Sequence, residues 1–151
     1  MGLKILKVLK DINTIAIDTS PFIYYIEEHE DYIHAIEPLF THINHGNIIA
    51  YTSLITLIEV LTKPIEEKDN NLINKYENLL TNSNNLILTD IDRNVAIESA
   101  KLRAKYSIKI PDAIQLTSGL INGAGAFITN DGNLRKINEI KIIVLDDVIK
   151  E

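Results

Sequence analysis

Four acidic side chains, rather than any histidine or cysteine, suggest the chemistry of this sequence: they are Asp18, Glu59, Asp112 and Asp131. Carboxylates that gather in one crevice repel one another unless a cation neutralises them. Their hard oxygen atoms suit Mg²⁺ or Mn²⁺. The chain of 151 residues contains no cysteine, which excludes thiolate catalysis and cysteine-based metal sites. The sequence therefore predicts a magnesium or manganese site formed by these four acids.

Asp18 stands at the carboxyl end of a short apolar strand expected over residues 14–18. Its structural alternative is the N-cap of the helix that follows. We expect Ser20 to cap that helix instead, because it directly precedes Pro21 and proline favours the first helical position. Asp18 is then a charge without a structural task, which favours a functional role.

Glu59 lies in a segment, residues 54–61, that is apolar nearly all round when drawn as a helix. Helical spacing puts it on one narrow polar stripe with Thr52, Thr56 and Lys63. Because an unpaired buried carboxylate is costly, either the stripe faces a polar site or Glu59 pairs with Lys63 four residues on. This segment alone leaves both interpretations open.

Asp112 and Asp131 each have a plausible structural role. Asp112 follows a proline in the first turn of an expected helix, where the backbone dipole favours acids. Asp131 follows the expected strand 126–129, and it or Asn130 could cap the helix that begins at Gly132. The two acids become informative only with the others: if the strands are parallel, all four carboxylates can point into one crevice at the strand ends.

The elements that must position these acids alternate between strands and helices, which predicts an α/β fold in three layers, α/β/α, with a central parallel sheet. The expected strands are 14–18, 48–52, 86–89, 126–129 and 142–145. The expected helices are one that opens at Ser20-Pro21 and others over 33–44, 53–64, 66–80, 92–106, 111–122 and 132–137. We expect Pro38 to kink or restart its helix and Pro64 to stop one. Without a repeat or linker, residues 1–151 are expected to form a single domain.

Small polar residues next to the acids would supply hydroxyl, amide and backbone contacts around the metal: Thr19, Ser20, Thr129 and Asn130. The net charge of −6 argues against binding nucleic acid through bulk positive charge. A basic stretch could still border the site. Its members are Arg93, Lys101, Arg103, Lys105 and Lys109. The simpler interpretation is that these side chains lie on helix faces that point into solvent.

The sequence also suggests where the protein acts and how it assembles. No apolar run approaches the length of a membrane span, and lysines interrupt the amphipathic N-terminal segment 2–10, so we expect a cytoplasmic protein. Residues 22–26 and 54–61 give the helices more apolar surface than one small sheet can cover. We therefore expect a homodimer built partly from these two runs.

Four short motifs follow one another along most of the chain. They are Ile17-Asp18-Thr19-Ser20; Ser53 followed by Glu59-Val60-Leu61; Pro111-Asp112-Ala113-Ile114-Gln115-Leu116; and Phe127-Ile128-Thr129-Asn130-Asp131. In order and spacing they resemble the motifs of the PIN-domain family. Within that family the chain looks like a VapC-type toxin, the nuclease half of a toxin–antitoxin pair.

This resemblance implies a flavodoxin-like α/β/α fold, Mg²⁺-dependent endoribonuclease activity on single-stranded RNA, dimerisation, and inhibition by a cognate antitoxin. Asp18, Glu59 and Asp112 would hold the main ion, and Asp131 would complete the pocket or bind a second ion. The implied reaction is in-line attack of water on a phosphodiester, which leaves 5′-phosphate and 3′-hydroxyl ends.

Two other functions fit parts of the pattern. A PIN fold could bind RNA or a protein partner without cutting, although the intact acids argue against this. A phosphoryl-accepting receiver domain has a similar sheet, but it would need two adjacent acids at the end of its first strand. Here that strand ends with Asp18-Thr19, so we rank the receiver domain last.

Overall fold

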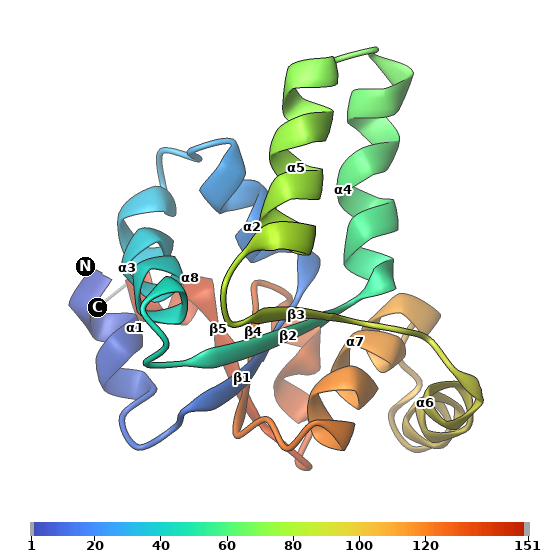
Figure 1. Ribbon diagram of the computed structural model, residues 1–151. Helices are drawn as coiled ribbons and strands as arrows, with labels where there is room; N and C mark the ends of the chain where they lie inside the picture. Colours follow the sequence, from blue (N-terminus) through green and yellow to red (C-terminus); the bar gives the residue numbers. More distant parts are fainter. Residues whose placement is uncertain (1, 150–151) are drawn as a thin grey trace.

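The chain folds around a parallel sheet of five strands, shown in the computed structural model of Figure 1, which describes residues 2–149. The strands lie in the order β3-β2-β1-β4-β5. Their bounds are β1 Thr14–Ile17, β2 Ile49–Ser53, β3 Leu86–Thr89, β4 Ala126–Thr129 and β5 Lys141–Val144. All five predicted strands are present, and β4 is buried along its whole length, as is typical of a parallel sheet with helices on both faces.

Helices cover both faces of the sheet, which confirms the predicted three-layer α/β/α fold (Figure 1). One layer consists of α1 Gly2–Val8, α2 Thr19–Ile26, α3 Ile33–Asn44, α4 Leu54–Glu66, α5 Asn70–Asn82 and α8 Leu145–Ile149. The other consists of α6 Arg93–Tyr106, α7 Ile110–Ile121 and the 3₁₀ helix η1 Gly132–Lys136.

Side chains of β1 alternate between the two faces of the sheet and so enter two different cores. Ile15 and Ile17 enter the core beneath the first layer, and Ala16 enters the core beneath the second. Phe22 in α2 is also fully buried, with its ring edge-on to Phe40 of α3. The expectation that Phe22 lies on a dimer surface is therefore wrong, because the monomer itself covers it.

Two prolines lie inside helices rather than at their ends. Pro38 is within α3, and Pro64 is within α4, which continues to its last residue, Glu66. A proline removes one backbone hydrogen bond, but packing of an amphipathic face supplies most of the stability of a helix in a protein. The predicted stop at Pro64 is therefore wrong. The next helix, predicted from residue 66, begins only at Asn70, with Asp69 as its N-cap.

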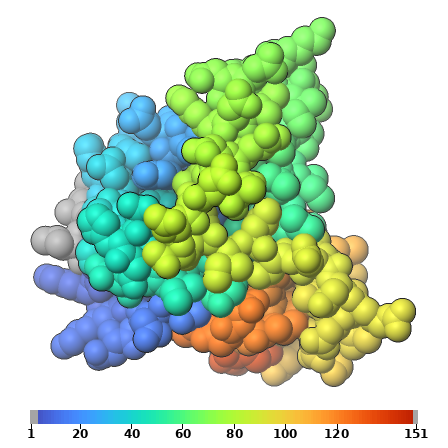
Figure 2. Space-filling view, in the orientation of Figure 1, coloured from blue at the N-terminus to red at the C-terminus, as the bar shows by residue number. Residues whose placement is uncertain are grey.

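Helices α4 and α5 pack against each other and project from the sheet as a hairpin, which Figures 1 and 2 show standing out beyond the rest of the molecule. Val60 and Leu80 anchor the base of the hairpin in the first core. Tyr76 adds a hydrogen bond from its hydroxyl to Glu27, directly after α2. Because α4 begins at the end of β2, its first turns stay next to the sheet.

The N-terminal segment forms the amphipathic helix α1, which packs against α3 and α8. Ile5 and the following Leu9 are almost completely buried there. Among the helices that the structure describes, none combines the length and the apolar character needed to cross a membrane.

Gly119 allows α7 to approach the central strand β1 closely. A Cβ atom at this position would lie 2.6 Å from the Cβ of Ala16, and neither atom belongs to the movable end of a long side chain. Glycine inside a helix is unfavourable by roughly 0.5–1 kcal/mol relative to alanine. The contact with β1 therefore explains why glycine occupies this position.

We predict that Gly119→Ala destabilises the protein by about 1–3 kcal/mol, because the added methyl group must push α7 away from β1. Urea unfolding followed by circular dichroism measures the change. The control is Thr117→Val on the same helix, since the buried Thr117 hydroxyl has no hydrogen-bond partner among the described residues. That variant should be as stable as the parent or more so. Unchanged stability of Gly119→Ala would contradict the close approach.

Candidate active site

The four acids predicted from the sequence lie around the carboxyl ends of β1 and β4. These strands are neighbours, and the chain leaves β1 toward β2 on one side and β4 toward β5 on the other. Open parallel sheets bind ligands at such a switch in strand order. Asp18 directly follows β1, Asp131 follows β4, and Asp112 lies in the first turn of α7.

Both carboxylate oxygens of Asp18 accept hydrogen bonds. Oδ1 accepts from the backbone N–H of Thr19 at 2.8 Å, and Oδ2 accepts from the hydroxyl of Thr129 at 2.7 Å. Asp18 is therefore the N-cap of α2, and the predicted cap, Ser20, lies inside the helix. The prediction failed because it took Pro21 as the first helical residue, whereas Pro21 is the third. Proline is tolerated there as well, since the backbone N–H groups of the first turn have no partner within the helix.

Burial raises the pKa of Asp18 to about 6 from its ordinary value of 3.8. The hydrogen bonds from Thr129 and Thr19 act in the opposite direction, whereas the negative charges of Asp112 and Glu59 raise the pKa further. Ionised Asp18 is thus disfavoured by its surroundings, and a cation would relieve that penalty.

Glu59 faces the same end of the sheet. Its Oε1 accepts a hydrogen bond from the Thr19 hydroxyl at 2.7 Å, while the residue stays exposed to solvent. Thr52 and Thr56, which share its predicted polar stripe, are buried with their hydroxyls 2.6 Å apart. The ammonium group of Lys63 lies 4.0 Å from a carboxylate oxygen of Glu67, one helical turn further on, rather than pairing with Glu59. Of the two interpretations left open by the sequence, the structure supports the polar site.

Asp112 is partly buried in the first turn of α7. Desolvation raises its pKa, the charges of Asp131 and Glu59 raise it further, and the charge of Lys109 lowers it. The N-cap of α7 is Lys109, whose side chain makes no capping hydrogen bond. The dipole of α7 therefore stabilises the ionised form of Asp112, whereas the charges of Asp131 and Glu59 destabilise it.

Thr129 connects the two acids that follow β1 and β4. Its hydroxyl donates to Asp18 and accepts from the backbone N–H of Asp131 at 3.1 Å. The Asp131 side chain also caps η1, because Oδ1 accepts from the N–H of Asn133 at 2.9 Å. The capping role considered for this pair therefore belongs to Asp131 and not to Asn130.

The four polar residues expected around the acids divide into two groups. Thr19 and Thr129 contact the acids directly. Asn130 instead donates to the Tyr24 hydroxyl at 3.0 Å and accepts from a backbone N–H at the start of α8 at 2.9 Å. Ser20 makes no side-chain hydrogen bond within the described part of the chain. Half of the expected supporting set therefore reaches the acids.

The basic stretch does not form a continuous positive rim. Lys101 and Lys105 each pair with a glutamate, at 2.9 and 3.5 Å, and Arg103 donates to a backbone carbonyl after α6. The simpler interpretation therefore applies to most of the stretch: its side chains lie on helix faces and pair with neighbouring groups of the protein. Lys109 differs, because its charge acts on Asp112.

The donor chemistry of the acids fits Mg²⁺ or Mn²⁺, but the side chains do not form a finished ligand set. Their oxygens are the ligands that these ions prefer, and their mutual repulsion is of the kind that a cation relieves. Within residues 2–149, however, no three histidine or acidic side chains lie close enough together to hold one ion. Binding an ion would therefore need some side-chain rotation.

Gln115 is the residue that the sequence reasoning missed. It is almost completely buried, and its Oε1 accepts from the N–H and the hydroxyl of Ser53 at 3.1 and 2.7 Å. Its Nε2 donates to the hydroxyls of Thr56 and Thr19 at 2.6 and 3.3 Å. The available signal was its position, one helical turn after Asp112 in an otherwise apolar segment.

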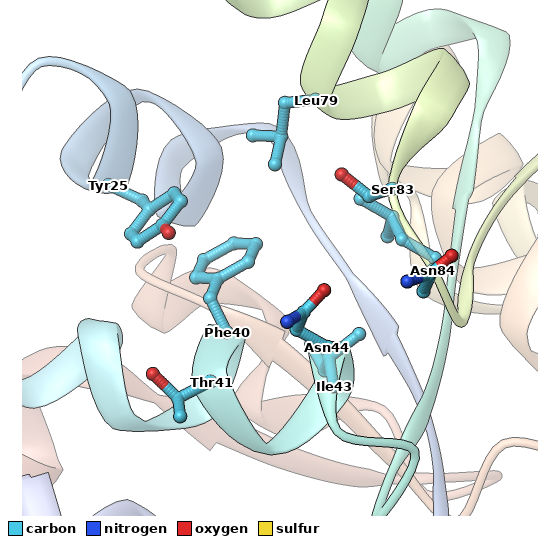
Figure 3. A pocket seen from close by; sticks show the side chains of 9 residues that line it. Tyr25, Phe40, Thr41, Ile43, Asn44, Leu79, Ser83 and Asn84 are labelled. Atoms are coloured by element: carbon cyan, nitrogen blue, oxygen red, sulfur yellow. The ribbon is translucent and has the colours of Figure 1, made fainter.

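A separate pocket of about 180 Å³ opens between α2, α3, α5 and β3 (Figure 3). Tyr25 and Phe40 form one wall, with their rings stacked at 4.2 Å between centroids. The lining residues are Tyr25, Phe40, Thr41, Ile43, Asn44, Leu79, Ser83, Asn84 and Leu86. None of them is one of the four acids, so this pocket is distinct from the candidate active site.

The comparison with known families agrees with the four motifs. The family model for the PIN domain matches residues 15–140, which include all four acids. The chain belongs to the PIN domain family. Among curated protein sequences, none matches this chain.

Solved structures with the same fold include toxin–antitoxin complexes from three bacteria. The VapBC2 complex of Rickettsia felis bound to a DNA fragment from its promoter is 18% identical, with a TM-score of 0.67 and 87% of this chain and 98% of that chain covered. DNA-bound VapBC from Salmonella typhimurium is 19% identical, with a TM-score of 0.66 and coverage of 89% and 99%. A complex from Klebsiella pneumoniae is 21% identical, with a TM-score of 0.65 and coverage of 87% and 97%. At these identities the likeness establishes the PIN fold.

We predict that Asp112→Asn raises the melting temperature of the metal-free protein at neutral pH, by roughly 2–4 °C, the shift that about 1 kcal/mol produces in a domain of this size. The folded-state pKa of Asp112 is raised, so ionising it costs stability. That penalty is absent below pH 3.8, where the acid is protonated in both states, and grows as the pH rises. The advantage of the variant should therefore shrink toward acidic pH.

Melting curves of both proteins in EDTA, at neutral and acidic pH, test this prediction. The control is Asp69→Asn, a change at the exposed N-cap of α5, which should give no such pH-dependent gain. A clear loss of stability in Asp112→Asn at neutral pH would mean that the acid serves the helix start and not a charged site.

Proposed function

We propose that this chain is a metal-dependent endoribonuclease of the VapC type, the toxin of a type II toxin–antitoxin system, which hydrolyses phosphodiester bonds in single-stranded RNA. The observation that carries the proposal is the position of the acids at the switch in strand order, where Asp18 and Asp131 follow neighbouring strands and share the Thr129 hydroxyl. Burial first, and the charges of neighbouring acids after it, raise the pKa of Asp18 and of Asp112, a penalty that a cation would relieve. The toxin–antitoxin complexes that share this fold support the same conclusion.

In this proposal Asp18, Glu59, Asp112 and Asp131 hold Mg²⁺ or Mn²⁺, which when bound would activate water and neutralise charge on the phosphate. Asp18 is the fixed member, because Thr129 and the N–H of Thr19 hold both of its oxygens. Glu59 is the adjustable member, since its residue is exposed and has a single hydroxyl partner.

Lys109 has a separate role in this proposal. It stands before α7 and its charge acts on Asp112. An ammonium group at this position would attract the phosphate backbone of RNA to an otherwise acidic site. The net charge of −6 leaves little attraction elsewhere.

The alternative is a PIN-fold module that binds RNA or a protein partner without cutting. One observation favours it: no three acids of the described residues converge closely enough to hold an ion as they stand. A module of this kind would bind RNA equally well in EDTA and would leave it intact, so the cleavage experiment below also decides between the two functions.

We predict that the purified full chain cleaves single-stranded RNA in Mg²⁺ or Mn²⁺ and stops when EDTA is added. The products should carry 5′-phosphate and 3′-hydroxyl ends, because water attacks the phosphorus, the bond from phosphorus to the 3′-oxygen breaks, and the 3′-oxygen leaves with a proton while the 2′-hydroxyl takes no part. Glu59→Gln and Asp112→Asn should each reduce the rate about 100-fold, because even the loss of a partner that orients a metal ligand typically costs about 10–100-fold. Gel analysis of end-labelled RNA measures both the rate and the ends.

Asp69→Asn, at the exposed N-cap of α5, is the matched control and should cleave like the parent. Cutting that continues undiminished in excess EDTA would rule out the metal mechanism. A parent protein that binds RNA without cutting it at any metal concentration would favour the non-catalytic module.

The proposed partner is a cognate antitoxin that blocks the active site. One of the solved structures with this fold is described as a toxin–antitoxin complex, and the other two are described as VapBC complexes bound to DNA. We expect a small reading frame beside the gene for this chain, encoding a protein that forms a stable complex with it and stops RNA cleavage. Mixing the two purified proteins before the cleavage assay tests this partnership directly.

We predict that the protein is a homodimer that uses the outer face of α4. Ile58 and Ile65 lie two helical turns apart on that face and are 61% and 56% exposed, which leaves an apolar surface for a second copy. The double change Ile58→Asp with Ile65→Asp should therefore give monomers in light scattering. Ile121→Asp, at an equally apolar but separate exposed position at the end of α7, should leave the dimer intact. A monomeric parent at high micromolar concentration would contradict the prediction.

A further inference from the structure

A network of hydrogen bonds, buried except at its end on Glu59, connects Gln115 on α7 to the Glu59 carboxylate on α4. Its intermediate members are hydroxyl groups at the end of β2 and at the starts of α2 and α4: those of Thr19, Thr52, Ser53 and Thr56. All of these intermediates are buried. A hydroxyl group has only one proton to donate, so the direction of each bond can be worked out from the two ends.

The first end is the backbone carbonyl of Ile17, which can only accept. Thr52 donates its one proton to that carbonyl at 2.8 Å. In the contact of 2.6 Å between the hydroxyls of Thr52 and Thr56, the proton must therefore come from Thr56. Thr56 has then no proton left for any other partner.

The second end is the backbone N–H of Ser53, which can only donate. The Gln115 atom that it meets at 3.1 Å must be the carbonyl oxygen, and the Ser53 hydroxyl donates to the same oxygen at 2.7 Å. That assignment fixes the orientation of the whole amide group. Its NH₂ group therefore points to the hydroxyls of Thr56 and Thr19 and donates one proton to each.

Thr19 receives a proton from Gln115 and has one proton of its own to give. Two oxygens are near: Oε1 of Glu59 at 2.7 Å and the Thr56 hydroxyl at 3.4 Å. The Thr56 oxygen already accepts from Gln115 at 2.6 Å, and the carboxylate is both nearer and the stronger acceptor. The Thr19 proton is therefore directed to Glu59.

We propose that Gln115 is a positioning residue for the metal site: its buried amide orients the Thr19 hydroxyl so that this hydroxyl donates to Glu59 and holds that carboxylate toward Asp18. The inference rests on the proposed function, because it takes Glu59 to be a metal ligand. Partners that orient ligands in this way commonly matter about 10–100-fold for metal affinity.

The type of residue fits this role. A glutamine amide donates two protons and accepts at its oxygen, and here all of these capacities are used without adding charge. A glutamate would add a further negative charge behind the Thr19 hydroxyl that contacts Glu59, and an apolar residue would leave the Ser53 N–H without its partner. The neutral amide therefore supports the acids without adding to their repulsion.

The test is Mn²⁺ binding to the full chain, measured by isothermal titration calorimetry without RNA. Gln115→Met and Thr19→Val should each raise the dissociation constant about 10-fold. Thr19→Ser keeps the hydroxyl and should bind like the parent. Thr117→Val removes a buried hydroxyl from the same helix and should also leave Mn²⁺ binding unchanged. An unchanged dissociation constant in folded Gln115→Met would overturn the proposal.

A double-mutant cycle separates positioning through Thr19 from a general loosening of the site. If Gln115 acts on Glu59 through Thr19, the double variant Thr19→Val with Gln115→Met should bind Mn²⁺ no more weakly than the weaker single variant. Two effects that multiply would mean that Gln115 acts by another route, and the proposal would be wrong.

Glu59→Gln in the same calorimetry distinguishes this proposal from the proposed function. If Glu59→Gln binds Mn²⁺ like the parent, the four-acid metal site itself is wrong. If Glu59→Gln loses binding while Gln115→Met keeps it, the metal site stands and the positioning role fails.

A measurement on the parent protein covers the case in which Gln115→Met does not fold. Gln115 is the only glutamine of the chain, so glutamine labelled with ¹⁵N in its side chain gives one pair of amide signals by NMR. Both protons should exchange with solvent far more slowly than those of free glutamine, and the signals should shift when Mg²⁺ is added. Exchange as fast as in free glutamine, or signals that ignore Mg²⁺, would contradict the proposal.

Discussion

The burial of the Asp18 carboxylate at the end of β1 is the constraint on which the surrounding arrangement depends. Desolvation disfavours its charged form, and two hydrogen bonds offset part of that penalty. One comes from Thr129, so β4 must lie directly beside β1; the other comes from the N–H of Thr19, so α2 must begin without a loop. The same Thr129 hydroxyl then fixes the N–H of Asp131. The pairing of β1 with β4, the start of α2 and the burial of the Asp18 charge therefore depend on one another.

The three layers, and the positions of the acids near one edge of the sheet, were predictable because they follow from local patterns. Short apolar runs separated by helical segments predict parallel strands, and residues that directly follow such strands must gather at one edge of the sheet. The polar stripe through Thr56 and Glu59 was likewise visible in an apolar helix, and the structure shows which of its two possible meanings applies. Each of these features is determined by residues that lie close together in the sequence.

The errors concern contacts between distant segments. Pro64 does not stop α4, because packing against the rest of the protein supports the helix beyond it. Ser20 is not the cap, because the place where α2 begins is set by the strand before it. Gln115 went unnoticed because its four hydrogen bonds go to three residues on other elements, 59 to 96 residues earlier in the chain. A motif shows that such a residue is present but not the contacts that it makes.

The pairing of Thr129 with Asp18 also determines when during protein synthesis the site can exist. The two residues are 111 positions apart, and β4 is needed to complete the sheet between β1 and β5. A growing chain on the ribosome therefore carries Asp18 and Glu59 before it has made the strand that holds Asp18 in place. Domains generally fold as units once their sequence has emerged. The acidic site accordingly comes together only after β4 has left the ribosome, so a nascent chain that stops short of Thr129 lacks it.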